Sequence, residues 1–247
     1  MEVPGVGLWL PHRRIVLPGD PDFSLPTMQA APAKVQSNTA TGAVSVTLGA
    51  GLTVGNLLIA VAARSDGAGQ GAPTVVAGAG RNMTWVASVQ AHTNGSTCHY
   101  FYRTIVSGDS NTVSFSNPGG TWGIGAVEFS GVTTTTGSTV TGTINTSGPT
   151  MGLTISPGAG NLVVAAFCTR MDPVSWTANG STNNLGVFGG SSGGLYDGCE
   201  WGWGLGNITI GGTQTGSARN AGFPWNGIAQ AFLAPAPPRV FSPGIIA

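Results

Sequence analysis

One sequence pattern occurs twice in this chain and constrains its fold more than any other feature. Residues 55–66 (GNLLIAVAARSD) are matched by residues 160–172 (GNLVVAAFCTRMD), and each copy follows a glycine-rich turn. A second pair, residues 122–129 and 225–232, repeats in the same order at nearly the same spacing. Two copies are too few for a solenoid, which needs at least three stacked units. The repeat therefore predicts a pseudo-symmetric β-sandwich built from two similar strand sets, over residues 43–132 and 151–234.

The body between residues 38 and 234 has the pattern of short strands separated by turns. Val113 and Phe115 alternate with polar residues, which is typical of a half-buried strand. The apolar runs 57–63 and 162–167 are continuous, which fits central strands that are covered on both faces. No apolar residues keep a helical period for more than about two turns. We therefore expect an all-β fold, a β-sandwich or jelly roll that forms one intertwined domain.

The expected strands share this alternating or continuous apolar pattern and end at glycine, proline or asparagine turns. They are residues 43–48, 56–64, 84–89, 97–105, 112–116 and 123–129 in the first copy, and 152–155, 161–170, 185–188, 196–203, 207–210 and 227–232 in the second, with a strand pair around 138–144.

Ten of the sixteen prolines lie in two tails, six between Pro4 and Pro32 and four between Pro235 and Pro243. Proline fixes φ and has no backbone N–H, so neither tail can be a helix or a central strand. Both tails are nevertheless richer in apolar residues than a disordered linker. We expect extended arms, residues 1–37 and 235–247, that bind neighbouring subunits. Their apolar contact residues are Trp9, Leu10, Ile15, Leu17, Phe23, Val240 and Phe241.

Charge is scarce and balanced. Asp, Glu, Lys and Arg make up 7% of the chain, and nine acidic residues match nine basic ones. A surface that binds nucleic acid or anionic lipid needs clustered Lys and Arg, so we expect neither partner. The start, Met-Glu-Val-Pro-Gly, has no basic segment, and we expect no secretory signal. Such a composition favours a protein that is packed into an assembly.

Groups suited to catalysis are scarce. Residues 189–193 fit the pattern G-x-S-x-G, but no helix follows, as a nucleophile elbow requires. Glycosidases need two carboxylates a few ångströms apart, and among the three glutamates only Glu128 and Glu200 lie in the body. Nothing in the sequence requires these two to meet. We therefore expect no enzymatic activity.

The histidines and cysteines show no metal-ligand spacing. His12, His92 and His99 lack a partner at such a spacing, and we expect neither a metal nor a cofactor. Cys98, Cys168 and Cys199 are odd in number and widely spaced, with no C-x-x-C pair. Small buried side chains are the favoured interpretation. A disulfide between Cys168 and Cys199 remains an alternative if the protein meets an oxidising medium.

Three aromatic residues of one expected strand are the best candidates for ligand binding. Trp201 and Trp203 are two apart and share a strand face, and Tyr196 lies in the same strand. Exposed, the tryptophans would stack on sugar rings; buried, they would belong to the core. The core is the favoured interpretation, and the glycan site stays open.

The order of these patterns resembles a set of bacteriophage and prophage virion proteins of the minor tail, fibre or head-surface type. The residues that carry the resemblance are 55–63, Trp85, 100–103, 113–115 and 126–132, with a weaker second copy up to about residue 234. The resemblance implies a lectin-like or jelly-roll sandwich that is displayed on a virion. The proline-rich ends lie outside it.

We therefore expect a non-enzymatic structural protein of a phage virion, a head decoration or spike protein or a minor tail protein. It would be assembled in the host cytoplasm, bind capsid or tail subunits through its arms, and form a homo-oligomer, with a trimer as one form. The alternative is a carbohydrate-binding module for a host or cell-surface glycan that uses Tyr196, Trp201 and Trp203.

Overall fold

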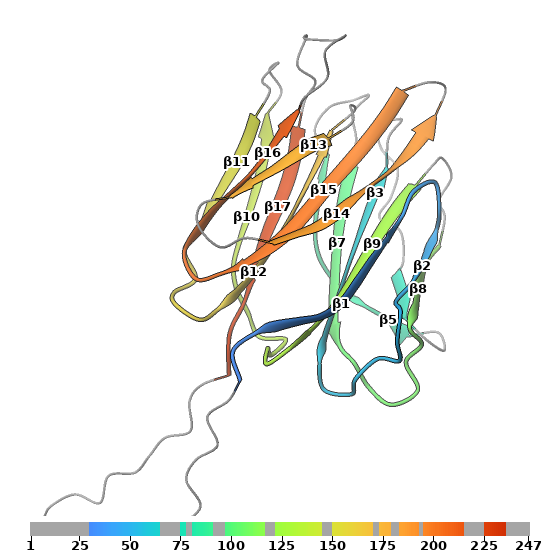
Figure 1. The fold of residues 1–247 in the computed structure, drawn as a ribbon, viewed down its shortest axis with the longest axis vertical. Coiled ribbons are helices and arrows are strands. Elements are labelled where there is room, and N and C mark those ends of the chain that lie inside the picture. The colour runs from blue at the N-terminus through green and yellow to red at the C-terminus, as the bar shows by residue number, and fades with distance from the viewer. Residues whose placement is uncertain are drawn as a thin grey trace, which may run out of the picture. The chain divides into compact units, whose positions relative to one another are not determined.

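The computed structural model describes residues 30–64, 75–77, 81–90, 97–116, 122–144, 150–169, 173–178, 183–192, 195–214 and 225–235. These residues form seventeen strands and no helix (Figure 1). The predicted all-β fold is confirmed. All the strands lie in one compact unit, Ala30–Pro235, which we call the body. None of the described residues forms a helix long and apolar enough to cross a lipid bilayer.

The first half of the body contains two antiparallel sheets. The larger sheet has the order β1-β9-β3-β7-β6, and the smaller has the order β2-β8-β4-β5. The larger sheet consists of β1 (Ala33–Ala40), β9 (Trp122–Ser130), β3 (Leu57–Arg64), β7 (Thr97–Thr104) and β6 (Thr84–Gln90). The smaller consists of β2 (Ser45–Thr47), β8 (Thr112–Phe115), β4 (Val75–Ala77) and β5 (Arg81–Asn82).

The second half repeats the first almost strand for strand. Its sheets have the orders β10-β17-β12-β15-β14 and β11-β16-β13. The larger consists of β10 (Thr136–Ile144), β17 (Trp225–Phe232), β12 (Leu162–Thr169), β15 (Leu195–Leu205) and β14 (Asn183–Ser192). The smaller consists of β11 (Thr150–Ile155), β16 (Ile208–Gln214) and β13 (Pro173–Ala178). Among these strands no sheet mixes the two halves: each of the two similar strand sets makes its own sandwich, and both belong to one compact unit.

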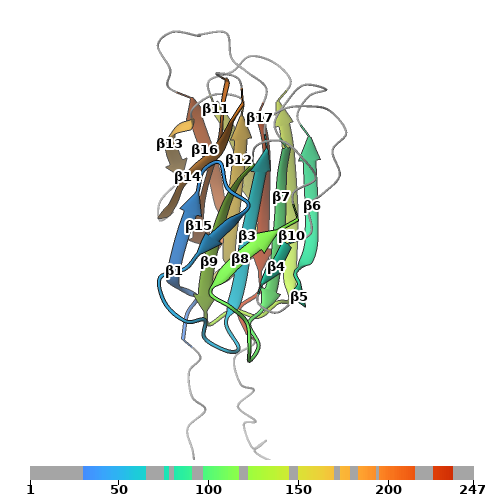
Figure 2. The same cartoon turned by 90° about the vertical axis from the view of Figure 1, so that its right-hand side faces the viewer.

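The two sandwiches pack through their five-stranded sheets, which gives four layers with three hydrophobic cores between them (Figures 1 and 2). The central core lies between the five-stranded sheets and includes Ile59, Val61, Tyr100, Phe129, Val164 and Trp201. A first outer core, with Leu58, Ala60, Phe101 and Trp122, and a second, with Val163, Ala165, Phe167 and Ile208, lie between the large and small sheets of each half.

This layering explains the two continuous apolar runs. Alternate residues of β3, such as Ile59 and Leu58, enter the central core and the first outer core respectively. In β12, Val164 and Val163 divide in the same way between the central and second outer cores. A strand with a core on each face has no polar side, so its sequence does not alternate. The prediction of central strands covered on both faces is confirmed.

Two ring contacts show that the halves face each other across a pseudo-twofold axis. Tyr102 packs edge-on against Phe232, with ring centroids 5.0 Å apart and planes inclined by 77°. Trp203 packs in the same way against Phe129, at 5.3 Å and 72°. The strand registers make Tyr102 equivalent to Trp203 and Phe232 equivalent to Phe129. Reciprocal contacts of this kind define the interface of a twofold dimer, here formed within one chain.

The body begins and ends beside the segment that joins its halves, residues 131–135. Gly131 has φ of +70°, and a Cβ there would lie 2.6 Å from the carbonyl oxygen of Ala30. On the other side, Thr133 N–H donates to the Leu233 carbonyl, and Leu233 N–H donates to the Thr135 carbonyl. The described chain thus enters and leaves the body at one end, which both views show at the bottom (Figures 1 and 2).

Four strands were not expected from the sequence. β4 and β5 are only three and two residues long, and β13 begins at a proline. β1 (AKVQSNTA) has few apolar residues, and its first part lies in residues 33–37, which we assigned to the N-terminal arm. Its backbone pairing with β9 along most of its length makes it an edge strand. Residues 33–40 form a strand because they hydrogen-bond to β9, and the sequence of one segment does not show which partner strand it will meet.

Candidate functional site

The predicted contact residues of the arms all lie outside the described residues. They are Trp9, Leu10, Ile15, Leu17, Phe23, Val240 and Phe241. Their role therefore stays a prediction, which is taken up below.

The aromatic strand residues proposed for glycan stacking are part of the interior. Trp201 is fully buried in the central core and contacts Phe188 edge-on, at 5.9 Å between centroids. Trp203 is half-buried and packs on Phe129. Tyr196 lies in β15, but its side chain is outside the described residues. The tryptophan pair cannot form an exposed sugar platform, because the opposite sandwich covers this face of β15. The core interpretation holds for Trp201.

Of the two body glutamates, only Glu128 has a described side chain. Glu128 lies in β9 and is fully buried. It accepts hydrogen bonds from Gln36 Nε2 at 2.6 Å, Asn56 Nδ2 at 2.6 Å and Thr53 N at 3.0 Å. Glu200 is in β15, a strand of the other half, and its side chain is outside the described residues. Glu128 therefore acts as an anchor for the chain between β2 and β3.

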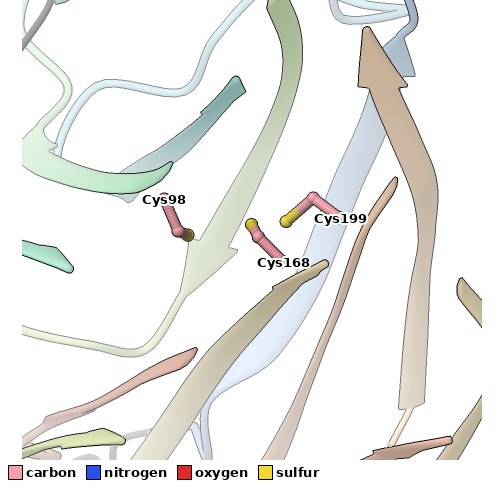
Figure 3. Close-up of side chains that lie close together, drawn as sticks. All are labelled: Cys98, Cys168 and Cys199. Carbon is pink, nitrogen blue, oxygen red and sulfur yellow. The ribbon is translucent and has the colours of Figure 1, made fainter. Parts of the chain in front are cut away.

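The three cysteines, far apart in sequence, come together in the central core; we call them the cysteine cluster (Figure 3). Cys98 comes from β7 of the first half, and Cys168 and Cys199 come from β12 and β15 of the second. Cys168 and Cys199 are directly paired across their strands. All three are fully buried free thiols, and their sulfur atoms lie within 4.8 Å of one another. Figure 3 shows the side chains converging from the two sides of the interface.

The thiols of the cysteine cluster differ in acidity. Hydrogen bonds from Cys168 and Cys199 lower the pKa of Cys98 from 9.0 to about 5, against the opposing effect of burial. Burial raises the pKa of Cys168 well above its usual value. Within the cluster the neighbouring thiols thus favour the deprotonated form of Cys98, whereas burial disfavours that of Cys168. Thiolates are ligands for soft metals, so three sulfur atoms this close together are a candidate metal site.

The repeat shows how the cluster arose from two similar halves. Cys98 and Cys199 occupy equivalent positions, because they pair with Ala63 and Cys168, which are themselves equivalent. The pseudo-twofold axis therefore passes close to the cluster. The third sulfur breaks the symmetry, since alanine occupies in the first half the position of Cys168. The sequence repeat is visible at β3 and β12 but not at β7 and β15, so the equivalence of Cys98 and Cys199 emerges only from the strand registers.

His99 lies on the other face of β7, in the first outer core. Its side chain is buried, stacks on Phe101 at 6.4 Å and lies 5.7 Å from Trp122, and neither ring nitrogen has a hydrogen-bond partner. Burial lowers the pKa of His99 from 6.5 to about 4. The imidazole is therefore neutral at pH 7, and its position among aromatic rings identifies it as a core residue.

This histidine makes stability depend on pH. Because the folded pKa of about 4 lies below the unfolded value of 6.5, the unfolded chain binds more protons between these limits, and stability falls as pH drops from 6.5 to 4. The full loss is on the order of 3 kcal/mol. We expect His99→Leu to flatten this part of the profile when urea unfolding is followed between pH 4 and 7. An unchanged slope in the variant would show that His99 is not the group responsible.

No protein-family model, curated protein or solved structure matches this chain.

Proposed function

We propose that this chain is a non-enzymatic structural protein of a bacteriophage virion, a β-sandwich body fastened to capsid or tail subunits by its terminal arms. One observation carries the proposal: the body starts at Ala30 and ends at Pro235 on the two sides of the same short segment, residues 131–135. The two points at which the arms join the body therefore lie at one end of it.

The chemistry of the arms supports attachment. Proline restricts the unbound chain, so an arm of this composition loses less conformational entropy on docking than an ordinary flexible segment. Its apolar side chains, such as Trp9 and Phe23, would fill grooves on a neighbouring subunit. An extended backbone would pair with an exposed strand edge of that subunit. The partners that we propose are capsid or tail subunits and further copies of this chain, with a trimer as one form.

The body is suited to display. It is built from antiparallel strands with a core on both faces of each five-stranded sheet, and few charged groups are needed to hold it together. We also infer that each half is a jelly roll of the lectin-like type. Strands that follow one another, such as β1, β2, β3 and β4, alternate between the large and the small sheet, as they do in double-sheet jelly rolls.

Deleting the N-terminal arm should separate attachment from folding. The deletion of residues 1–29 stops before β1, so the body remains complete. We expect the deleted chain to melt at the same temperature as the full chain and to enter particles more than about tenfold less well. Burying one large apolar side chain contributes about 1.5–3 kcal/mol, and 1.4 kcal/mol is a factor of ten in affinity. Tagged chains supplied during particle growth and quantified in purified particles provide the measurement.

Point variants sharpen the same experiment. Trp9→Ala and Phe23→Ala should each lower incorporation, whereas Ser24→Ala, a polar position in the same arm, should leave it unchanged. Full incorporation of the chain that lacks residues 1–29 would refute attachment by the N-terminal arm. Absence of the full-length chain from purified particles would refute the virion proposal itself.

A further inference from the structure

The cysteine cluster is unusual because packing alone does not require it. The equivalent of Cys168 in the first half is Ala63, which fills the same kind of position in the central core. An apolar residue is therefore sufficient for the fold at that position. Three free thiols instead point at one another across the interface between the halves (Figure 3).

We propose that Cys98, Cys168 and Cys199 bind one Cu(I) ion through their three sulfur atoms, inside the interface between the two halves. The proposal is independent of the virion role, since it concerns the interior of the body. It commits to a soft d¹⁰ ion held by sulfur alone.

The ligand set selects this ion. Among the described residues the cluster contains three sulfurs and no histidine or carboxylate. Thiolates favour Cu(I), Zn(II) and iron–sulfur clusters, while harder ions prefer oxygen. Structural zinc sites use four ligands, so a site with three sulfurs fits zinc poorly. Cu(I) is stable with three sulfur ligands in one plane, and sulfur atoms already within 4.8 Å of one another need only small shifts to bind one ion.

Copper binding needs no redox step: one Cu⁺ and three thiols give a complex of net charge −2 and three protons. Each bond from sulfur to copper replaces an S–H bond, and its proton goes to solvent. All three cysteines lose their protons when the metal binds, and the geometry of the cluster gives no order of ligation. Asn226, fully buried and paired with Cys168 across β12 and β17, places a polar amide next to the new charge. Copper stays in the +1 state, so no oxidant or reductant is consumed.

The cluster is also near an end of the sheets. Cys98 is the second residue of β7, and Cys168 is the last but one of β12. An ion therefore reaches the sulfurs by opening the ends of these strands, without separating the whole interface. Metal should be supplied both to the folded protein and during refolding, so that slow entry does not hide binding.

The test is anaerobic titration of the reduced full-length protein with Cu(I) in the presence of a competing Cu(I) chelator. We expect one copper per chain, a first shell of three sulfurs by X-ray absorption, and a higher melting temperature with copper bound. Loss of a group that only orients a metal ligand lowers metal affinity by about 10–100-fold. Cys168→Ala removes a ligand itself and should therefore weaken copper binding by more than about 100-fold. This variant should fold, since the first half carries alanine at the equivalent position.

A matched control keeps the number of thiols constant. Cys168→Ala combined with Val163→Cys has three thiols, but the new one faces the second outer core. It should bind no better than Cys168→Ala alone. Three results would each overturn the proposal. The control could bind copper as well as wild type, or the protein could take up no copper by either route. The freshly isolated protein could also contain a Cys168–Cys199 disulfide whose reduction restores no binding.

Discussion

Gly125→Ala should lower the free energy of unfolding by about 1–3 kcal/mol, and Gly125→Val by more. A Cβ at this position of β9 would lie 2.7 Å from Trp201 Cζ2 and 2.8 Å from Phe188 Cε1. Both rings belong to the other half and are fully buried, so an added Cβ would force packed core side chains to shift. The glycine lets the backbone of one sandwich approach the tryptophan of the other. Its loss should therefore weaken the interface between the halves.

Urea unfolding of purified variants measures this effect, and the chain offers a matched control. A Cβ on Gly49 meets no atom within 4 Å, and its φ is not in the left-handed region, so Gly49→Ala should be close to neutral. In a double-mutant cycle, Trp201→Leu should recover part of the stability that Gly125→Ala removes, because a smaller side chain relieves the overlap. Equal stability of Gly125→Ala and wild type would contradict the close approach.

Glu128→Ala should lower the free energy of unfolding by about 3 kcal/mol or more. The carboxylate accepts hydrogen bonds from Gln36, Thr53 and Asn56. Its removal leaves these donors without an acceptor beside the core. Each donor that water does not reach then costs about 1–3 kcal/mol of stability. The stability of Glu128→Gln should fall between those of wild type and Glu128→Ala, because the amide keeps one acceptor but adds an NH₂ group that faces other donors. Thermal and urea unfolding of the three proteins provide the comparison.

The second half supplies an internal control for this anchor. The strand registers place Ala231 where the first half has Glu128, and Asn161 where it has Asn56. Asn161 donates to the Pro157 carbonyl and accepts from Ala234 N–H, so the chain before β12 is held without a carboxylate. Asn161→Ala should therefore destabilise the body independently of Glu128. Additive losses in the double variant would support two separate anchors, whereas strong coupling would contradict this arrangement.

The sequence predicted those strands whose own residues show an apolar pattern. The runs from Leu57 and Leu162 showed both the strands and the repeat, because a strand with two buried faces has a continuous apolar pattern. β1 was not expected, since its pairing partner β9 follows some eighty residues later, between residues 122 and 130. The pattern also does not say which sheet a strand joins. The pattern therefore predicts two similar strand sets but not that each set forms its own pair of sheets.

The cysteine cluster could have been found only with the register of the repeats. Cys98 and Cys199 become equivalent once β7 and β15 are aligned through their pairing with β3 and β12. This equivalence shows only that each cysteine has the same position within its own half. It does not show that the two cysteines lie next to each other. Their proximity follows from the pseudo-twofold packing, which depends on the shapes of Tyr102, Trp203 and their ring partners. Spacing along the chain holds no information about that arrangement.

The way the body joins the arms determines how it would bear mechanical load. In antiparallel sheets the hydrogen bonds lie perpendicular to the strands, so tension along a strand shears many bonds at once. β17 leads to the C-terminal arm and is bonded on both sides, by β10 and β12, whereas β1 follows the N-terminal arm and is bonded only to β9. Tension through the arms would therefore strip β1 from its sheet first and leave β17 as the stronger tether.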